Sequence, residues 1–183
     1  MSEETNPREF GEQIESVEPT HEGWTKYLAL TTAIIAVIAA IASLASGTYA
    51  DRALLEKNQA VLVQAQASDR WNYYQAKGIK KDLADGLFQQ SQNAKFKDDA
   101  DRYGKEQEKI KDEAQDLAQK VEVANTRAEG LFERHHRIAM GVTFFQIAIA
   151  LSAIAAMLRN KLFWGLSVTV TGVGVVFFVT GVM

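Results

Sequence analysis

Three aromatic side chains, Trp71, Tyr73 and Tyr74, lie among charges and amides in the stretch ASDRWNYYQAKGIK, residues 67–80. Stacking of nucleic-acid bases would need such rings in a net-positive groove, and a cage of rings could bind a quaternary ammonium group. The surrounding segment, residues 51–137, carries 16 basic and 16 acidic side chains, which argues against nucleic acid. We therefore predict that Trp71 and Tyr74 pack against another helix, of this chain or of a neighbour; a ligand site is the alternative.

The remaining reactive side chains form no catalytic set. His135 and His136 are adjacent, so they point about 100° apart on a helix, whereas a metal-binding pair needs a spacing of three or four residues. Glu133 and His136 have that spacing, but two ligands bind weakly unless a neighbouring chain supplies more. Cysteine is absent, and no glycine-rich phosphate loop occurs. We expect no enzymatic activity, no catalytic residue, no metal and no cofactor.

Three long segments lack Asp, Glu, Lys, Arg and His, namely residues 27–50, 138–158 and 162–183. Each can cross a bilayer core of about 30 Å at about 1.5 Å per residue. We predict an all-α protein with transmembrane helices over residues 26–50, 137–158 and 162–183.

Two polar segments complete the chain. Residues 1–25 hold seven glutamates against one arginine and are predicted to be a disordered tail, with a short amphipathic turn through residues 10–17 as the alternative. Residues 51–136 are predicted to form an antiparallel helical hairpin, a coiled-coil stalk with arms over 51–88 and 96–136 and a turn near residues 91–94.

Small residues follow three- and four-residue steps along the first apolar segment, and small residues let helix backbones approach closely in lipid. This stripe predicts a helix-packing face within or between protomers, and it comprises Ala29, Ala33, Ala36, Ala40, Ser43, Gly47 and Ala50. The same stepping continues into the polar segment through Leu54, Asn58, Val61, Ala65, Ser68, Asn72, Gln75 and Ile79. We expect this continuation to be the seam of the first arm.

The return arm has a clearer heptad pattern, with charges at the other positions. Its predicted seam is Phe96, Ala100, Tyr103, Gln107, Ile110, Ala114, Leu117, Val121, Ala124, Ala128 and Leu131, and it continues through His135, Ile138, Val142, Phe145 and Ile149. Alanine-rich seams bury little area in each layer, so we expect the protein to be a homo-oligomer.

The last two apolar segments contain their own polar and small residues. Gly165 and Gly172 lie on one predicted small face, with Thr169 between them. Gln146 is the one long polar side chain within the apolar segments, and we predict that it forms an interhelical hydrogen bond.

The chain resembles an uncharacterised family of bacterial membrane proteins, a domain of unknown function. The resemblance rests on W-x-x-Y-Q-A-K-x-I-K at residues 71–80, ALTTA at 29–33, FQIAIAL at 145–151, and Tyr103, Glu106, Gln107, Glu108, Ile110 and Lys111 in the return arm. It implies three membrane spans with a long helical insertion between the first two, and it implies no activity. The loop Arg159-Asn160-Lys161 is less arginine-rich than is usual in similar proteins.

Together these patterns predict a non-enzymatic, homo-oligomeric membrane scaffold or assembly protein. Its partners would be membrane lipid, copies of itself and an unknown protein, and not nucleic acid. The alternative is an oligomeric channel or a transport accessory subunit, with Thr169, Thr171, Gly172 or Gln146 facing a pore. We expect a multi-pass protein of the bacterial inner membrane. The short basic loop places that loop and the amino terminus in the cytoplasm and the stalk in the periplasm.

Overall fold

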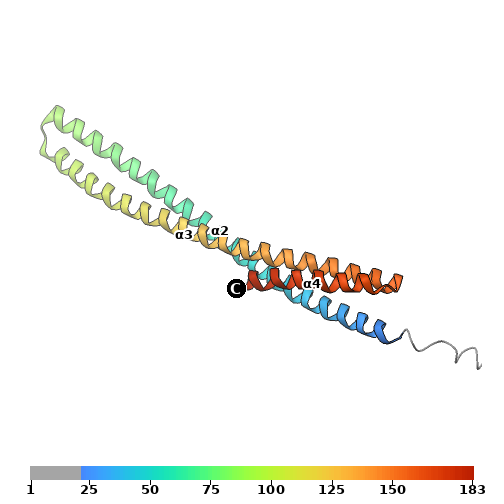
Figure 1. The fold of residues 1–183 in the computed structure, drawn as a ribbon. Helices are drawn as coiled ribbons and strands as arrows, with labels where there is room; N and C mark the ends of the chain where they lie inside the picture. The colour runs from blue at the N-terminus through green and yellow to red at the C-terminus, as the bar shows by residue number, and fades with distance from the viewer. Residues whose placement is uncertain (1–21) are drawn as a thin grey trace, which may run out of the picture. The chain divides into compact units, whose positions relative to one another are not determined.

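The computed structural model describes residues 22–183, and every regular element in this part of the chain is an α-helix. The helices are α2 (Glu22–Ser91), α3 (Ala94–Leu158) and α4 (Lys161–Val182) (Figure 1). The prediction of an all-α protein is therefore confirmed. Most of the predicted acidic tail, including the alternative turn at residues 10–17, lies outside the described residues.

Two short breaks separate the three helices, and each has the same local cause. Gln92 (φ 53°) follows α2 and Arg159 (φ 49°) follows α3, both in the left-handed conformation that ends many helices. An asparagine then begins the next helix in each case. The Oδ1 atom of Asn93 accepts a hydrogen bond from the Lys95 amide at 3.0 Å, and that of Asn160 accepts from the Leu162 amide at 2.9 Å.

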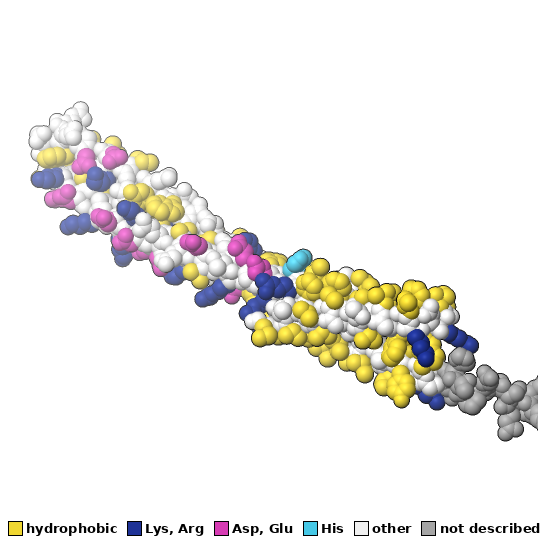
Figure 2. Space-filling view, viewed as in Figure 1, with side chains coloured by type: hydrophobic (Ala, Val, Ile, Leu, Met, Phe, Trp, Pro, Cys, Tyr) yellow, Lys and Arg dark blue, Asp and Glu magenta, His cyan; other side chains and the backbone are white. Residues whose placement is uncertain are grey.

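The described residues divide into two compact units. One, here called the apolar unit, comprises residues 22–46 and 136–183; the other, the polar unit, comprises residues 47–135. Hydrophobic side chains gather over the apolar unit, whereas acidic and basic side chains are interspersed over the polar unit (Figure 2). All three helices contain a segment long and apolar enough to cross a membrane.

In the apolar unit, α3 and α4 pack closely because glycines of α4 face large side chains of α3. A Cβ atom added to Gly174 would lie 2.8 Å from Cε1 of Phe145, and one added to Gly181 would lie 2.6 Å from Cγ1 of Ile138. One further layer is polar: the hydroxyls of Ser152 and Ser167 lie 2.7 Å apart, and Ser167 donates to the carbonyl of Ala148 at 2.8 Å. Contacts therefore recur every seven residues along both helices, which run in opposite directions.

In the polar unit, α2 and α3 lie side by side and also run in opposite directions. Nζ of Lys57 donates to Oδ1 of Asn125 at 2.8 Å, whereas Arg70, further along α2, pairs with Glu113, which lies earlier in α3. The surface between the two helices is built mainly from alanine, which permits close approach. Its buried apolar residues are Ala53, Ala60, Val63, Ala67, Ala84, Ala100, Ile110, Ala114, Ala124 and Ala128.

The seam predicted for the return arm matches the surface that α3 presents to α2, since each of its members is buried or half-buried. The seam predicted for α2 is wrong as a contact within the chain. Every member from Leu54 to Ile79 is exposed, and the buried positions lie one residue earlier, as at Ala53, Ala60 and Ala67. The physical reason is size: α2 turns its smallest face to α3 and leaves its larger apolar side chains outside.

Candidate functional site

The most elaborate cluster of the polar unit surrounds Lys77, the lysine of the W-x-x-Y-Q-A-K stretch. Its ammonium group lies 5.3 Å from the ring centre of Tyr73 on α2 and 5.2 Å from that of Tyr103 on α3. The same ammonium group forms an ion pair with Glu106 on α3. Only 12% of the Lys77 side chain is exposed, so the lysine is held between both helices by cation–π and ionic contacts.

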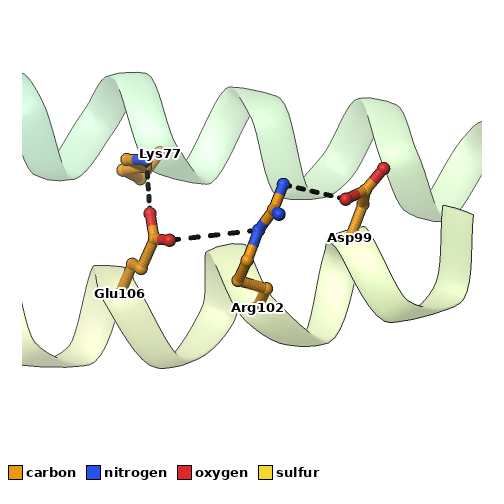
Figure 3. Close-up of polar contacts among 4 residues, drawn as sticks. All are labelled: Lys77, Asp99, Arg102 and Glu106. Atoms are coloured by element: carbon orange, nitrogen blue, oxygen red, sulfur yellow. Dashed lines mark hydrogen bonds and ion pairs between the residues drawn. The ribbon is translucent and has the colours of Figure 1, made fainter. Parts of the chain in front are cut away.

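The ion pair continues along α3 (Figure 3). Arg102 approaches Glu106 at 4.0 Å and pairs with Asp99 at 2.8 Å. The hydrogen bond from Lys77 is the largest effect on the pKa of Glu106 and lowers it. Desolvation opposes this effect, and the positive charges of Lys77 and Arg102 lower the pKa further. The hydrogen bond with Glu106 likewise raises the pKa of Lys77. Both groups are therefore held in their charged forms, which suits a structural contact between helices rather than proton transfer.

The rings of Trp71 and Tyr74 lie on the side of α2 that faces α3. They meet edge to face, with ring centres 5.5 Å apart, and both are half-buried. Beside them, Nε2 of Gln107 approaches the Tyr74 carbonyl at 3.4 Å and lies so close to Gly78 that a Cβ atom there would be 2.7 Å away. The stretch thus makes several contacts with one short part of α3, through Gly78 and the backbone of Tyr74. That Trp71 and Tyr74 pack on another helix stays a prediction. Asn72, Gln75 and Ile79, which were expected in the seam, are exposed instead.

In the apolar unit, the predicted small-residue face of α2 is not covered by the chain itself. Ala33, Ala36, Ala40 and Ser43 are exposed. Gly47, at the start of the polar unit, has nothing within 4 Å of a Cβ atom placed there. The side chains that α2 buries in the apolar unit are different ones, namely Leu28, Ile35, Ala42 and Ser46. Packing within the chain therefore does not account for the small face, and contact between protomers stays a prediction.

Part of the same face borders a hollow of about 430 Å³ between α2 and α3. Ala29, Ala33 and Ala36 line it on one side, and Ser152 and Ala153 line it on the other. The lining side chains are small and mostly apolar.

The small face predicted on α4 is also uncovered. Added Cβ atoms at Gly165 and Gly172 would meet nothing within 4 Å. The glycines that permit close packing are Gly141, Gly174 and Gly181, which sequence reasoning missed. The seven-residue spacing of Ser167, Gly174 and Gly181 was a usable signal, because small residues at that spacing share a helix face.

Several polar side chains of the apolar unit form hydrogen bonds. Thr169 and Thr171 donate to carbonyls of their own helix at 3.0 and 2.8 Å, and Nε1 of Trp164 donates to Oγ1 of Thr31 at 3.1 Å, which joins α4 to α2. Gln146 is exposed and forms no hydrogen bond within residues 22–183. Its predicted interhelical hydrogen bond is therefore not made within the described chain.

Residues 22–183 contain no group of three or more His, Asp or Glu side chains placed to hold a metal ion. His135 is half-buried and His136 is exposed. The site that the structure offers is thus a set of helix surfaces, some used within the chain and some uncovered.

In a comparison with known families, the family described as Domain of unknown function (DUF4337) matches residues 24–183. The chain belongs to this family. The DUF4337 match spans all three described helices almost completely, and it confirms the uncharacterised family expected from the sequence. No curated protein and no solved structure matches the chain.

Proposed function

We propose that this DUF4337 protein is a non-enzymatic membrane scaffold, in which the apolar unit self-associates in the bilayer and the polar unit stands out from it as a helical hairpin stalk. The observation that carries the proposal is the uncovered small-residue face of α2. In lipid, close contact between helices favours small residues, because dispersion and interhelical hydrogen bonds replace the hydrophobic drive. Because the chain itself does not cover this small-residue face, we propose that a second copy of the chain covers it.

Membrane insertion is supported by the burial pattern. In the most apolar window of each helix only 22%, 33% and 11% of residues are buried inside the protein, for α2, α3 and α4 respectively. Exposed side chains there include Ile34, Leu44 and Val176. Such large apolar surfaces are typical of helices surrounded by lipid.

Gln146 supports self-association independently. Its amide is exposed on α3 within a segment that lacks charged residues and has no hydrogen-bond partner among the described residues. In a bilayer an interhelical hydrogen bond to such a side chain contributes about 0.6–2 kcal/mol. In the proposed oligomer, a neighbouring protomer provides the hydrogen-bond partner of Gln146.

A structural role also suits the charged clusters. Lys77 and Glu106 are paired across α2 and α3, which fixes the relative position of the two arms. The ends of the apolar unit agree with a bilayer boundary, since Trp24, Lys26 and Lys161 are residue types favoured at the interface. We place the protein in the bacterial inner membrane, with the loop at residues 159–161 in the cytoplasm and the polar unit in the periplasm.

The proposal is tested by enlarging one small residue on the empty face. Ala40→Leu places a bulky side chain on that face and should shift the full-length protein in mild detergent toward monomer, as measured by light scattering after gel filtration. Ala150→Leu is the matched control, because Ala150 is also exposed in the apolar unit but lies on α3. A wild-type protein that is already monomeric, or equal oligomer fractions for both variants, would count against the proposal.

A further inference from the structure

The outward face of α2 in the polar unit is unusually apolar. Within residues 47–135, all of which are described, each large apolar side chain that is more than half exposed lies on α2. These side chains are Leu54, Leu55, Val61, Leu62, Ile79 and Leu83. On α3 of the same unit, the most exposed large apolar side chain is Val123 at 44%. The polar unit thus has one polar side and one side that exposes aliphatic surface to water.

Three of these six side chains, Leu54, Val61 and Ile79, fall on the a and d positions of one heptad frame, and the other three lie at the adjacent e position. With Leu54 and Val61 at d positions, the a positions hold Asn58, Ala65, Asn72 and Ile79, and all of these residues are exposed. This seam is separate from the alanine face that packs on α3, so α2 has two packing faces and uses one of them within the chain. The remaining d positions hold Ser68 and Gln75, so four of the eight seam positions are apolar and four are polar. Apolar residues at a and d positions drive the pairing of helices in water.

The polar members of the seam identify the kind of partner. Asn58 and Asn72 occupy a positions, and neither forms a hydrogen bond with another described residue. An asparagine at an a position pairs with its own counterpart in a parallel coiled coil and thereby sets register and strand number. In an antiparallel pair an a residue faces a d residue, which would place Asn72 opposite an aliphatic side chain such as Val61.

We infer that this seam, residues 54–79 of α2, pairs with the same seam of a second copy, parallel and in register. Equivalent layers then meet, so Leu54 and Val61 pack on their counterparts while Asn58 and Asn72 hydrogen-bond to theirs. The flanking positions bring no like charges together, because Lys57 lies near Leu62 of the partner copy and Gln64 lies near Asp69 of that copy. Burial of the aliphatic residues supplies the driving force.

The parallel direction rests on the proposed function. Two copies inserted in one membrane with the same topology necessarily present their α2 helices in the same direction. The preceding part of α2 carries the uncovered small residues, including Ala40 and Ser43, at the same three- and four-residue steps. In a parallel pair, the apolar part of α2 lies beside the apolar part of the partner copy's α2, and the two seams at residues 54–79 also lie side by side. In an antiparallel pair, charged residues of one copy would lie in lipid.

The test uses the absence of native cysteine, so that each variant carries one thiol. Ser68→Cys puts the thiol at a d position of the seam, and Gln115→Cys puts it on the exposed side of α3 as a matched control. A disulfide forms only when the two Cα atoms come within about 7 Å. On mild oxidation of membranes containing the full-length protein, Ser68→Cys should give about tenfold more disulfide-linked dimer than Gln115→Cys.

Orientation is tested by mixing variants. Co-expressed Val61→Cys and Asn72→Cys chains should form mixed dimers poorly, whereas an antiparallel seam would link them readily and overturn the inference. An oligomeric protein in which Ser68→Cys links no better than Gln115→Cys also overturns the inference but leaves the proposed scaffold in place. A protein that remains monomeric in the membrane overturns both.

Discussion

The packing of α4 on α3 makes a sharp prediction about a single methyl group. In Gly174→Ala the new Cβ atom would lie 2.8 and 2.9 Å from two ring atoms of Phe145 and 3.1 Å from the carbonyl oxygen of Gly141. Carbon atoms prefer separations of about 3.5–4.0 Å, so the ring or the helix must move by roughly 0.7 Å. Phe145 is fully buried and has no open side into which to move.

The expected cost follows from the behaviour of close-packed cores. Overpacking costs about 1–3 kcal/mol, and a value of about 2 kcal/mol changes the folding equilibrium roughly thirtyfold. Gly172→Ala is the matched control, because a Cβ atom there meets nothing within 4 Å. Both substitutions gain the same helix propensity of about 1 kcal/mol, so this contribution cancels in the comparison.

The assay is reversible unfolding of the full-length protein in mixed micelles, titrated with SDS and followed by far-UV circular dichroism. Gly174→Ala should be less stable than Gly172→Ala by about 1–3 kcal/mol. In a Phe145→Leu background the cost of Gly174→Ala should fall, because the ring atoms that it meets are gone. Equal stability of the two alanine variants, or an unchanged cost in the leucine background, would refute the proposed contact between Gly174 and Phe145.

Two further predictions concern the polar unit. The pKa of Glu106 is lower in the folded protein than in the unfolded chain, where it is about 4.3. The stability contributed by the Lys77–Glu106 ion pair is therefore fully present above about pH 4.3 and is lost as the pH falls through the folded-state pKa. Glu106→Gln should therefore lower the thermal midpoint of the polar helices at neutral pH and differ less from wild type near about pH 3, as followed by circular dichroism; an equal difference at both pH values would contradict this. Ala114→Leu, at a fully buried seam position, should destabilise the chain by about 1–3 kcal/mol relative to Ala118→Leu at an exposed one, and equal denaturant midpoints would contradict the alanine-based packing.

Composition was sufficient to predict the helical elements. Apart from Met183, the charge-free segments lie within α2, α3 and α4, and the break after α2 falls at Gln92 and Asn93, inside the expected turn. The seam of the return arm was predictable because its apolar positions, such as Ile110 and Leu117, alternate regularly with charges. In such a helix only one face can be buried, so the periodicity has a single interpretation.

The contact face of α2 was not predictable in the same way. Two of its faces have heptad spacing, one built from Ala53, Ala60 and Ala67 and the other from larger residues such as Leu54 and Val61. The sequence pattern favours the larger residues as the seam of the first arm, whereas the structure buries the alanines against α3 because they allow closer approach. Pattern alone cannot distinguish two such faces.

The glycines of α4 show the same limit. Gly165 and Gly172 share one seven-residue spacing, and Gly174 and Gly181 share another. Which pair allows close packing depends on where Phe145 and Ile138 lie on the opposing helix, and that is a property of the three-dimensional register. The small-residue faces of α2 and α4 that remain uncovered within the chain are therefore the candidates for contact between protomers.

Self-association is the central claim, and the mass of the protein in discs of native membrane tests it most directly. The discs are cut from membranes that express the wild-type protein at a low level, so that assembly is not forced by concentration. If the protein self-associates, the protein mass in each disc will be two or more times that of the 20.3 kDa chain. A uniform population of single 20.3 kDa chains would contradict it.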